Sequence, residues 1–414
     1  MSKKPVVIYG VTGYTGRLVA EYLREYRIPF IAAGRDGKRV KEVLDKVPGI
    51  ENADYEIAEV EHSTEALTKL FKGSQVVCNM VGPFMKYGPE AVEASLAAGC
   101  HYTDTNGEQN WMMHAEKEWG AAFAKRNLLL TPGIAQMYTT GEIAANICLE
   151  TPGLDTLDIL VLWKGFPTYA STQTIFSILT SNFYYLEQDQ YVQWSPFAKA
   201  EVMVPGQHAV AMALPWGGTA HPVWFKNDPR VANCRAMGGV FERTVMDGVV
   251  QITQVVEDQI KKMPKEQQEK ALSDMAAKLQ AGMPPRENHR INTSMDSVHA
   301  SGPGGAHVHC VIHGSSNYKQ TGLLQAYAAY HLLKAPAKRW GFASGCQAFG
   351  HRELLGVLVR YPLRTGAAAL LCLGLAGAAG ADLGTSFLPT LEENNLWIRV
   401  TLPNTVELGY SARV

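Results

Sequence analysis

The fold follows from the N-terminal stretch Val6-Val7-Ile8-Tyr9-Gly10-Val11-Thr12-Gly13-Tyr14-Thr15-Gly16-Arg17-Leu18-Val19. An apolar run ends in three glycines spaced three apart, and apolar residues then recur at helical intervals. The stretch therefore predicts a strand, a tight turn and a helix. Backbone N–H groups at the start of such a helix, together with the helix dipole, favour a bound anion. We expect the pyrophosphate of a dinucleotide there, although the spacing is G-x-x-G-x-x-G rather than G-x-G-x-x-G.

The glycines of this turn have separate roles. Gly10 permits the tight turn, Gly13 lets the backbone approach the pyrophosphate, and Gly16 lets the helix pack close to the strand. The residues between them border the same site. The predicted cofactor contacts of the turn are Gly10, Thr12, Gly13, Tyr14, Thr15 and Gly16.

The end of the second strand indicates which dinucleotide is bound. NAD-binding domains place an Asp or Glu about 20 residues after the glycines, whereas this strand ends in Gly34-Arg35. A guanidinium pairs with a 2′-phosphate, which a carboxylate repels. Gly34 and Arg35 therefore favour NADP(H). NAD(H) remains the alternative because Asp36 follows directly.

Strands and helices alternate as far as residue 133, which predicts a six-stranded parallel sheet of the doubly wound Rossmann type. The loop after the fourth strand lies beside the cofactor ribose and nicotinamide in such a sheet. Its predicted cofactor contacts are Asn79, Val81, Gly82, Pro83 and Phe84.

The rest of the chain predicts a second, α+β domain with a mixed sheet. A hairpin is expected from residues 290–301 and 306–314, and a helix from Tyr169 to Leu186. On the returning hairpin strand His307, His309 and His313 share one face. We interpret this face as solvated or as the wall of a cleft, and predict no metal site, because a closed site needs four ligands.

The bulk composition excludes some classes of function. The 414 residues carry a net charge of −1, so no basic face for nucleic acid is expected. The seven cysteines include no C-x-x-C pair, and the apolar run after Met1 is too short for a secretory signal. We therefore expect a cytoplasmic protein with reduced thiols, and a homodimer is an open alternative to the monomer.

The C-terminal region contains 17 uncharged residues, 365–381, rich in Ala, Leu and Gly. A membrane-spanning helix needs about 20 residues. We expect a buried or interfacial segment, with membrane association as the less favoured alternative. The expected divisions are a nucleotide-binding domain, a mixed-sheet substrate domain, helices returning to the first domain, and an apolar tail of uncertain role; these span residues 1–135, 136–319, 320–360 and 361–414.

The motifs together resemble the saccharopine dehydrogenase-like oxidoreductases, especially the branch of trans-acting enoyl reductases. The resemblance is dense over residues 5–135 and returns over residues 295–358. It is carried by the glycine turn, Ala33-Gly34-Arg35, Val81-Gly82-Pro83-Phe84, Tyr87-Gly88, Cys100-His101-Tyr102-Thr103-Asp104, Gly107-Glu108, Gly302-Pro303-Gly304-Gly305 and Tyr318-Lys319-Gln320-Thr321-Gly322.

The resemblance implies an NADP(H)-dependent oxidoreductase that transfers a hydride. Aromatic residues of the second domain suggest a hydrophobic small molecule with an activated C=C or C=O bond as substrate. Reduction leaves charge on oxygen, which a donor must stabilise. The expected wall residues are Tyr184, Trp194, Trp216 and Trp224. The candidates for the donor are Tyr87, His101, Tyr102 and Tyr318 with Lys319, and Asp104 and Glu108 are alternatives for a proton relay or are caps and turn residues.

Two alternatives stay open. The first is C–N chemistry on an amino acid, as in saccharopine formation, which needs clustered Arg or Lys for several carboxylates. The middle of the chain disperses its basic residues, which disfavours it. The second is an inactive NADP-binding scaffold or membrane-associated adaptor.

Overall fold

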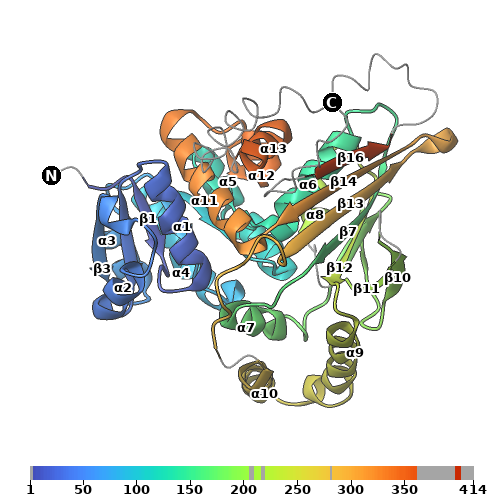
Figure 1. The fold of residues 1–414 in the computed structure, drawn as a ribbon, viewed down its shortest axis with the longest axis horizontal. Coiled ribbons are helices and arrows are strands. Elements are labelled where there is room, and N and C mark those ends of the chain that lie inside the picture. Colours follow the sequence, from blue (N-terminus) through green and yellow to red (C-terminus); the bar gives the residue numbers. More distant parts are fainter. Residues whose placement is uncertain (1–2, 205–208, 216–219, 280–281, 361–396, 402–414) are drawn as a thin grey trace, which may run out of the picture.

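The computed structural model describes residues 3–204, 209–215, 220–279, 282–360 and 397–401. Their core is built around two seven-stranded sheets (Figure 1). The first sheet is parallel, in the order β15-β6-β5-β4-β1-β2-β3. Its strands are β1 (Val6–Tyr9), β2 (Phe30–Gly34), β3 (Tyr55–Glu59), β4 (Val76–Asn79), β5 (His101–Asp104), β6 (Leu129–Thr131) and β15 (Gly341–Phe342).

The predicted Rossmann sheet is thus confirmed, with one strand more than the six expected. The seventh, β15, comes from the far end of the chain and pairs with β6. Two residues are too few to produce a sequence pattern, so this strand depends on tertiary pairing. The helices around the sheet are α1 (Tyr14–Glu25), α2 (Gly37–Leu44), α3 (Thr64–Phe71), α4 (Phe84–Ala98) and α5 (Gln109–Lys125), with the 3₁₀ turn η1 (Ile50–Asn52).

The second sheet is mixed, in the order β16-β14-β13-β7-β12-β8-β9, and a two-stranded sheet joins β10 to β11. The hairpin of β13 and β14 confirms the prediction, with Ser301 opposite His307 next to the turn. The strands are β7 (Thr156–Trp163), β8 (Tyr184–Glu187), β9 (Gln190–Gln193), β10 (Ala200–Met203), β11 (Val210–Ala213), β12 (Asn233–Val240), β13 (Thr293–Ser301), β14 (His307–Ser315) and β16 (Trp397–Thr401).

The helix expected from Tyr169 to Leu186 is wrong in its second half. Helix α7 ends at Ser177, and Tyr184 begins β8 instead. The side-chain amide of Gln109 explains the difference, because it bonds both the N–H and the C=O of Tyr184, at 2.8 and 3.0 Å. This contact comes from 75 residues away and leaves no local signal.

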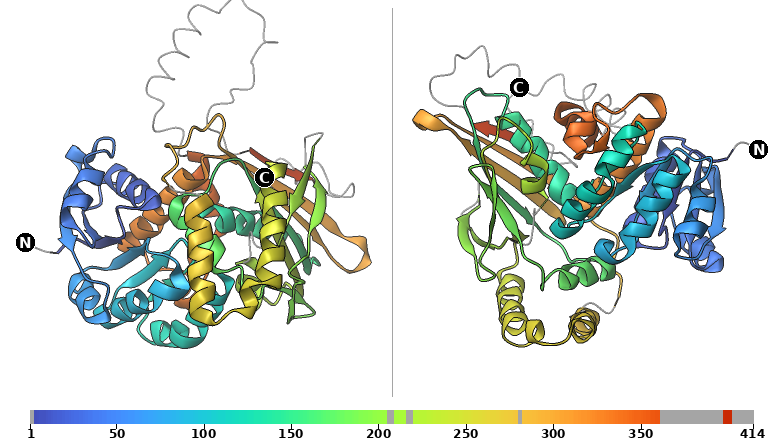
Figure 2. Two further views of the ribbon diagram at one scale, coloured as in Figure 1. Left: turned by 90° about the horizontal axis from the view of Figure 1, so that it is seen from below. Right: turned by 180° about the vertical axis from the view of Figure 1, so that it is seen from behind.

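The remaining helices connect the two sheets or cover the second. Helix α11 contacts α1, α6 and the first sheet, while α6 contacts β13 and β14, so both helices lie between the sheets (Figure 1). Helix α10 packs on α7, and Figure 1 and the right view of Figure 2 place α9 and α10 below the second sheet. These elements are α6 (Gln136–Cys148), α7 (Tyr169–Ser177), α8 (His221–Phe225), α9 (Arg243–Asp258), η2 (Ile260–Lys262), α10 (Lys265–Leu279), η3 (Pro303–Gly305), α11 (Asn317–Lys334), α12 (Gly345–Phe349) and α13 (His351–Arg360).

Within the described part of the chain, no helix is both long enough and apolar enough to cross a membrane. The apolar run 365–381 lies outside the described residues.

Candidate functional site

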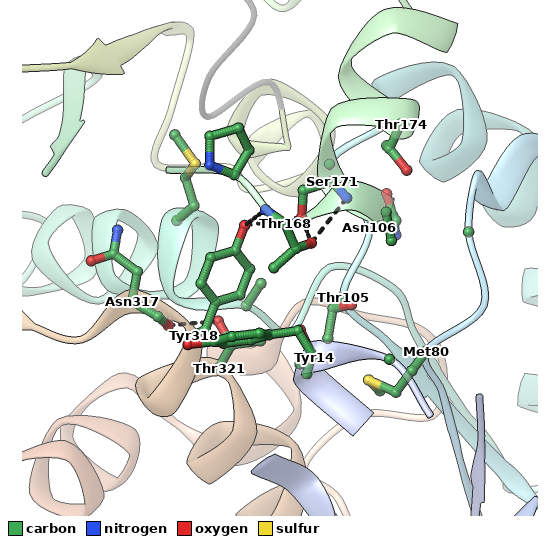
Figure 3. A pocket seen from close by; sticks show the side chains of 18 of the residues that line it. Tyr14, Met80, Thr105, Asn106, Thr168, Ser171, Thr174, Asn317, Tyr318 and Thr321 are labelled. Carbon is green, nitrogen blue, oxygen red and sulfur yellow. Dashed lines mark hydrogen bonds between the residues drawn. The ribbon is translucent and has the colours of Figure 1, made fainter. Parts of the chain in front are cut away.

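A pocket opens between the carboxyl edge of the first sheet and helix α7, next to the start of α11 (Figure 3). The empty space within it is about 1120 Å³, open solvent at its mouth included. None of its described lining side chains is charged. The lining residues are Gly13, Tyr14, Thr15, Gly16, Met80, Gly82, Phe84, Thr105, Asn106, Gly107, Ala135, Gln136, Met137, Tyr138, Trp163, Pro167, Thr168, Ala170, Ser171, Thr174, Ile175, Ile178, Asn317, Tyr318 and Thr321.

The glycine turn forms one wall of this pocket, and its geometry shows why glycine is needed. Gly10 has φ +89°, and a Cβ there would lie 2.7 Å from the Val81 side chain. A Cβ on Gly16 would lie 2.6 Å from the carbonyl oxygen of Gly10. Gly13 is the N-cap of α1, whose first turn contains no acidic residue. The turn therefore presents backbone N–H groups to the pocket, as an anion site requires.

The loop after β2 places Arg35 in solvent, while Asp36 is engaged elsewhere. The Asp36 carboxylate caps α2 by accepting a hydrogen bond of 3.0 Å from the N–H of Arg39. It is therefore committed to the helix rather than to a ribose. The side chain of Arg35 is exposed at the end of β2. This arrangement suits a 2′-phosphate better than a free 2′-hydroxyl.

Asn79 holds the loop that carries Val81, Gly82, Pro83 and Phe84. Its side chain is fully buried, and its Oδ1 accepts the N–H of Val81 at 2.9 Å. Its Nδ2 donates to the Tyr102 hydroxyl, also at 2.9 Å. Asn79 thus shapes the wall formed by Met80, Gly82 and Phe84, although it does not itself line the pocket.

Tyr102 and Asp104 form a buried network beneath the pocket. The Tyr102 hydroxyl donates to Asp104, which also accepts hydrogen bonds from Asn106, from the N–H of Gly133 and from the indole of Trp111, all within 3.0 Å. Burial raises the pKa of both Tyr102 and Asp104. Since neither lines the pocket, the structure gives them a supporting position for the loops after β5 and β6.

The Glu108 carboxylate caps the start of helix α4. Proline favours the first turn of a helix, yet this helix already begins at Phe84, so Pro89 lies inside it. The Glu108 carboxylate accepts the N–H groups of Phe84 and Met85 at 2.5 and 2.8 Å. This remote cap allows the earlier start, which the local sequence does not signal.

Three other candidate donors lie outside the lining. His101 begins β5 at the amino edge of the sheet, where its ring stacks on Trp340 and its Nδ1 accepts the N–H of Leu129. Burial lowers the pKa of His101 to about 4, so its ring is neutral. Tyr87 packs on the ring of His62, and Lys319 contributes a backbone N–H to Glu287 rather than a side chain to the pocket.

Tyr318 is the candidate that the structure brings into the pocket. Its hydroxyl donates to Ser171 Oγ and accepts the N–H of Thr168, both at 3.0 Å (Figure 3). Its ring meets Tyr14 edge-on, with 5.2 Å between the ring centres. Burial raises the pKa of Tyr318, which keeps the hydroxyl protonated at neutral pH. Tyr318 is thus a hydrogen-bond donor facing the same space as the glycine turn.

The part of the lining formed by α6, the end of β7 and α7 was not expected from the sequence. Met137, Tyr138, Trp163 and residues of α7 line the pocket. The only local signal was the cap at Thr168, whose Oγ1 accepts the N–H of Ser171 and starts α7. Sequence alone gives no reason for this helix to face the cofactor turn.

The aromatic wall expected from Tyr184, Trp194 and Trp224 is wrong. Trp224 is buried in the core of the first domain, and Tyr184 belongs to β8. Trp194 lines a separate hollow beside α9. Trp216, the fourth expected residue, lies outside the described residues. The aromatic side chains that do line the pocket are Tyr14, Phe84, Tyr138, Trp163 and Tyr318.

Comparison with known families places the chain. Residues 139–368, more than half of its length, match a family of unknown function, DUF5938. The chain belongs to the DUF5938 family. Residues 6–124 match the saccharopine dehydrogenase NADP binding domain. The DUF5938 region therefore follows a nucleotide-binding domain, and the predicted resemblance and cofactor, NADP(H), are confirmed.

The curated relatives match less than a third of this chain. A lipid droplet localized protein of Caenorhabditis elegans is 32% identical over 127 residues, which cover 29% of this chain and 30% of the relative. A trans-acting enoyl reductase of Mycobacterium ulcerans is 34% identical over 106 residues, 25% of each chain. The match thus spans less than a third of these relatives' own length.

The whole fold has a counterpart among solved structures. Saccharopine dehydrogenase (L-Glu forming) from Saccharomyces cerevisiae superposes with a TM-score of 0.54 at 12% identity, over 96% of this chain and 100% of that one. At this identity the likeness concerns the fold alone. The chain thus combines an NADP-binding domain with a DUF5938 region in a fold like that of this solved structure.

Proposed function

We propose that this protein reduces an activated C=C or C=O bond of a predominantly apolar small molecule, with NADPH as the hydride source. The observation that carries the proposal is a pocket shared by the glycine turn and Tyr318, whose described lining has no charged side chain. The NADP-binding domain supplies the cofactor class. The relatives named as enoyl reductases support the C=C form of the reaction.

The chemistry that the residues must perform is limited. When bound, NADPH supplies a hydride to carbon, and the electron pair of the reduced double bond moves toward oxygen. Tyr318 then turns its hydroxyl hydrogen from Ser171 Oγ to that oxygen and stabilises it with a hydrogen bond. Ser171 and the N–H of Thr168 hold the tyrosine hydroxyl in place. Met80, Phe84 and Ile175 contribute apolar surface to the same pocket.

The alternative of C–N chemistry on an amino acid fits this pocket poorly. An oxoacid and an amino acid carry several carboxylates, which need Arg or Lys partners. The pocket lining offers Gln136, Asn317 and hydroxyl groups instead. We therefore rank this reaction below reduction of an uncharged substrate. An inactive NADP-binding scaffold is the other alternative.

The proposal is tested by NADPH oxidation with enones, enoyl thioesters, ketones, and an amino acid paired with an oxoacid. We expect turnover with one of the first three classes. Turnover only with the amino acid and oxoacid would contradict the proposal. Tight NADPH binding without turnover of any substrate would favour the scaffold.

The variant Tyr318→Phe tests the donor. It removes the hydroxyl and keeps the ring against Tyr14, so kcat is expected to fall about 100- to 10,000-fold with NADPH affinity retained. Tyr330→Phe on the same helix, outside the pocket, is the matched control. Unchanged kcat in Tyr318→Phe would reject the role of Tyr318.

We propose that the protein works in the cytoplasm on a lipid-like substrate. The name of the nematode relative refers to lipid droplets, which are the alternative location. Imaging of the tagged full-length chain in cells with stained droplets distinguishes the two locations, and sedimentation analysis tests the homodimer.

A further inference from the structure

A short segment of the second domain crosses the start of α1 and the start of α11. We call residues 283–287, which lie between α10 and β13, the strap. The Tyr14 hydroxyl donates to the carbonyl of Pro285 and accepts the N–H of Glu287, both at 2.9 Å. Arg286 forms an ion pair of 2.7 Å with Glu21 of α1. The strap is thus fastened to the helix that carries the glycine turn.

The start of α11 lacks a cap of its own. Its N-cap residue, Ser316, has left-handed backbone angles (φ 58°, ψ 71°), and its side chain makes no cap hydrogen bond. Ser316 Oγ is buried without a hydrogen-bond partner among the described residues. The first N–H groups of a helix need acceptors from elsewhere when the local cap fails.

Glu287 provides those acceptors from the strap. Its Oε2 accepts the N–H of Lys319 at 3.0 Å, and the neighbouring N–H groups of Asn317 and Tyr318 also favour the charged form of the carboxylate. A carboxylate at a helix start also interacts favourably with the helix dipole. Glu287 therefore holds the first turn of α11 at Lys319, next to Tyr318, while the Tyr318 hydroxyl is held by Ser171 and Thr168.

We propose that Glu287 is a positioning residue that aims the Tyr318 hydroxyl into the cofactor pocket. This inference rests on the proposed function, in which Tyr318 is the donor. The strap also bonds Tyr14 through its backbone, so one segment fastens the glycine turn and the donor helix together. Substitution of the Glu287 side chain leaves the backbone bonds to Tyr14 available and removes only the cap.

The experiment compares Glu287→Ala, Glu287→Gln and Glu287→Asp in the full chain, with Glu269→Gln, exposed on α10, as the control. A misplaced donor lowers the rate of the chemical step, so kcat of Glu287→Ala is expected to fall about 10- to 100-fold. KM for NADPH is expected to change less than about threefold, since Glu287 does not line the pocket. Glu287→Asp or Glu287→Gln, which keep an acceptor, are expected to restore part of kcat.

Hydrogen exchange supplies a readout that needs no substrate. Loss of charge-assisted hydrogen bonds is expected to speed amide exchange at Asn317, Tyr318 and Lys319 about tenfold or more in Glu287→Ala. The control is expected to exchange like the wild type. Unchanged exchange at these amides would overturn the capping role, even if the wild type reduces no substrate tested.

The two readouts separate the possible failures. Faster exchange with unchanged kcat in Glu287→Ala would show a purely structural cap and overturn the positioning role. If the wild type turns over no substrate, the proposed function fails and the positioning role fails with it, whereas faster exchange would still establish the cap.

Discussion

At the scale of single residues, the position of Asp36 bears on cofactor choice. In the sequence, Asp36 leaves NAD(H) as the alternative cofactor, because a carboxylate after the second strand binds the ribose hydroxyls in NAD-binding domains. In the structure its carboxylate caps α2 through the N–H of Arg39. Arg35, exposed at the end of β2, then remains as the proposed partner of a 2′-phosphate. One intrahelical cap thus strengthens the argument for NADP(H).

The first prediction concerns Arg35→Ala. Loss of a charge-assisted contact with the 2′-phosphate, about 1.5–3 kcal/mol, is expected to weaken NADPH binding about 10- to 100-fold. NADH affinity is expected to stay within about twofold. Titration calorimetry with both cofactors measures this, and Lys41→Ala, exposed on α2, serves as the control. Equal losses for NADPH and NADH would contradict the role of Arg35.

At the scale of elements, the contact between α1 and α11 brings Tyr14 and Tyr318 together. Gly322 of α11 faces Leu18 of α1, and a Cβ on Gly322 would lie 2.7 Å from the Leu18 Cβ. The helices approach this closely only because residue 322 has no side chain. Their separation would also pull the two tyrosine rings apart, which now lie 5.2 Å between centres.

The second prediction compares two glycines in helices. Gly322→Leu is expected to lower the free energy of unfolding by at least about 1–3 kcal/mol through overpacking. Gly356→Ala on α13 has no neighbour within 4 Å of the added Cβ, so it is expected to raise stability by about 0.5–1 kcal/mol. Chemical denaturation of both variants measures the contrast. Equal changes in the free energy of unfolding for Gly322→Leu and Gly356→Ala would show that α1 and α11 are not tightly packed at Gly322.

At the scale of the whole molecule, buried carboxylates join elements that are distant in sequence. Glu142 of α6 accepts the Ser344 hydroxyl and the N–H of Cys346, which tie α12 to α6. Burial raises the pKa of Glu142 to about 7, from an ordinary value of 4.5. The folded chain therefore holds a proton on Glu142 that the unfolded chain releases between about pH 4.5 and 7.

This proton predicts a pH-dependent stability difference. The contribution of Glu142 is most favourable below about pH 4.5 and is lost as the pH rises through about 7. Glu142→Gln removes this dependence, so its stability relative to wild type is expected to improve by about 2–3 kcal/mol from pH 4.5 to 7.5. His101, whose pKa is lowered to about 4, acts in the opposite direction, and comparison with wild type cancels it.

Thermal or chemical unfolding across this pH range makes the measurement. Glu266→Gln, exposed on α10, is the control and is expected to run parallel to the wild type. A constant offset between Glu142→Gln and wild type at all pH values would contradict the buried, protonated state of Glu142.

The sequence by itself determined the first domain and its cofactor. Strand, glycine turn and helix are local patterns. A Cβ at Gly10 or Gly16 would clash with neighbouring atoms, so glycine at these positions indicates the backbone geometry of the turn. The hairpin of β13 and β14 was predictable for the same reason, since alternation and a Gly-Pro-Gly-Gly turn are local.

Only the tertiary structure decided which residues meet over the cofactor turn. Tyr318 reaches the pocket because α11 packs on α1, and its helix is capped by Glu287, 32 residues away. Helix α4 and strand β8 likewise begin where Glu108 and Gln109 supply hydrogen bonds. Side-chain hydrogen bonds between distant segments leave no periodic pattern in the sequence. The part of the pocket outside the glycine turn therefore depends on how the two sheets and their helices pack together.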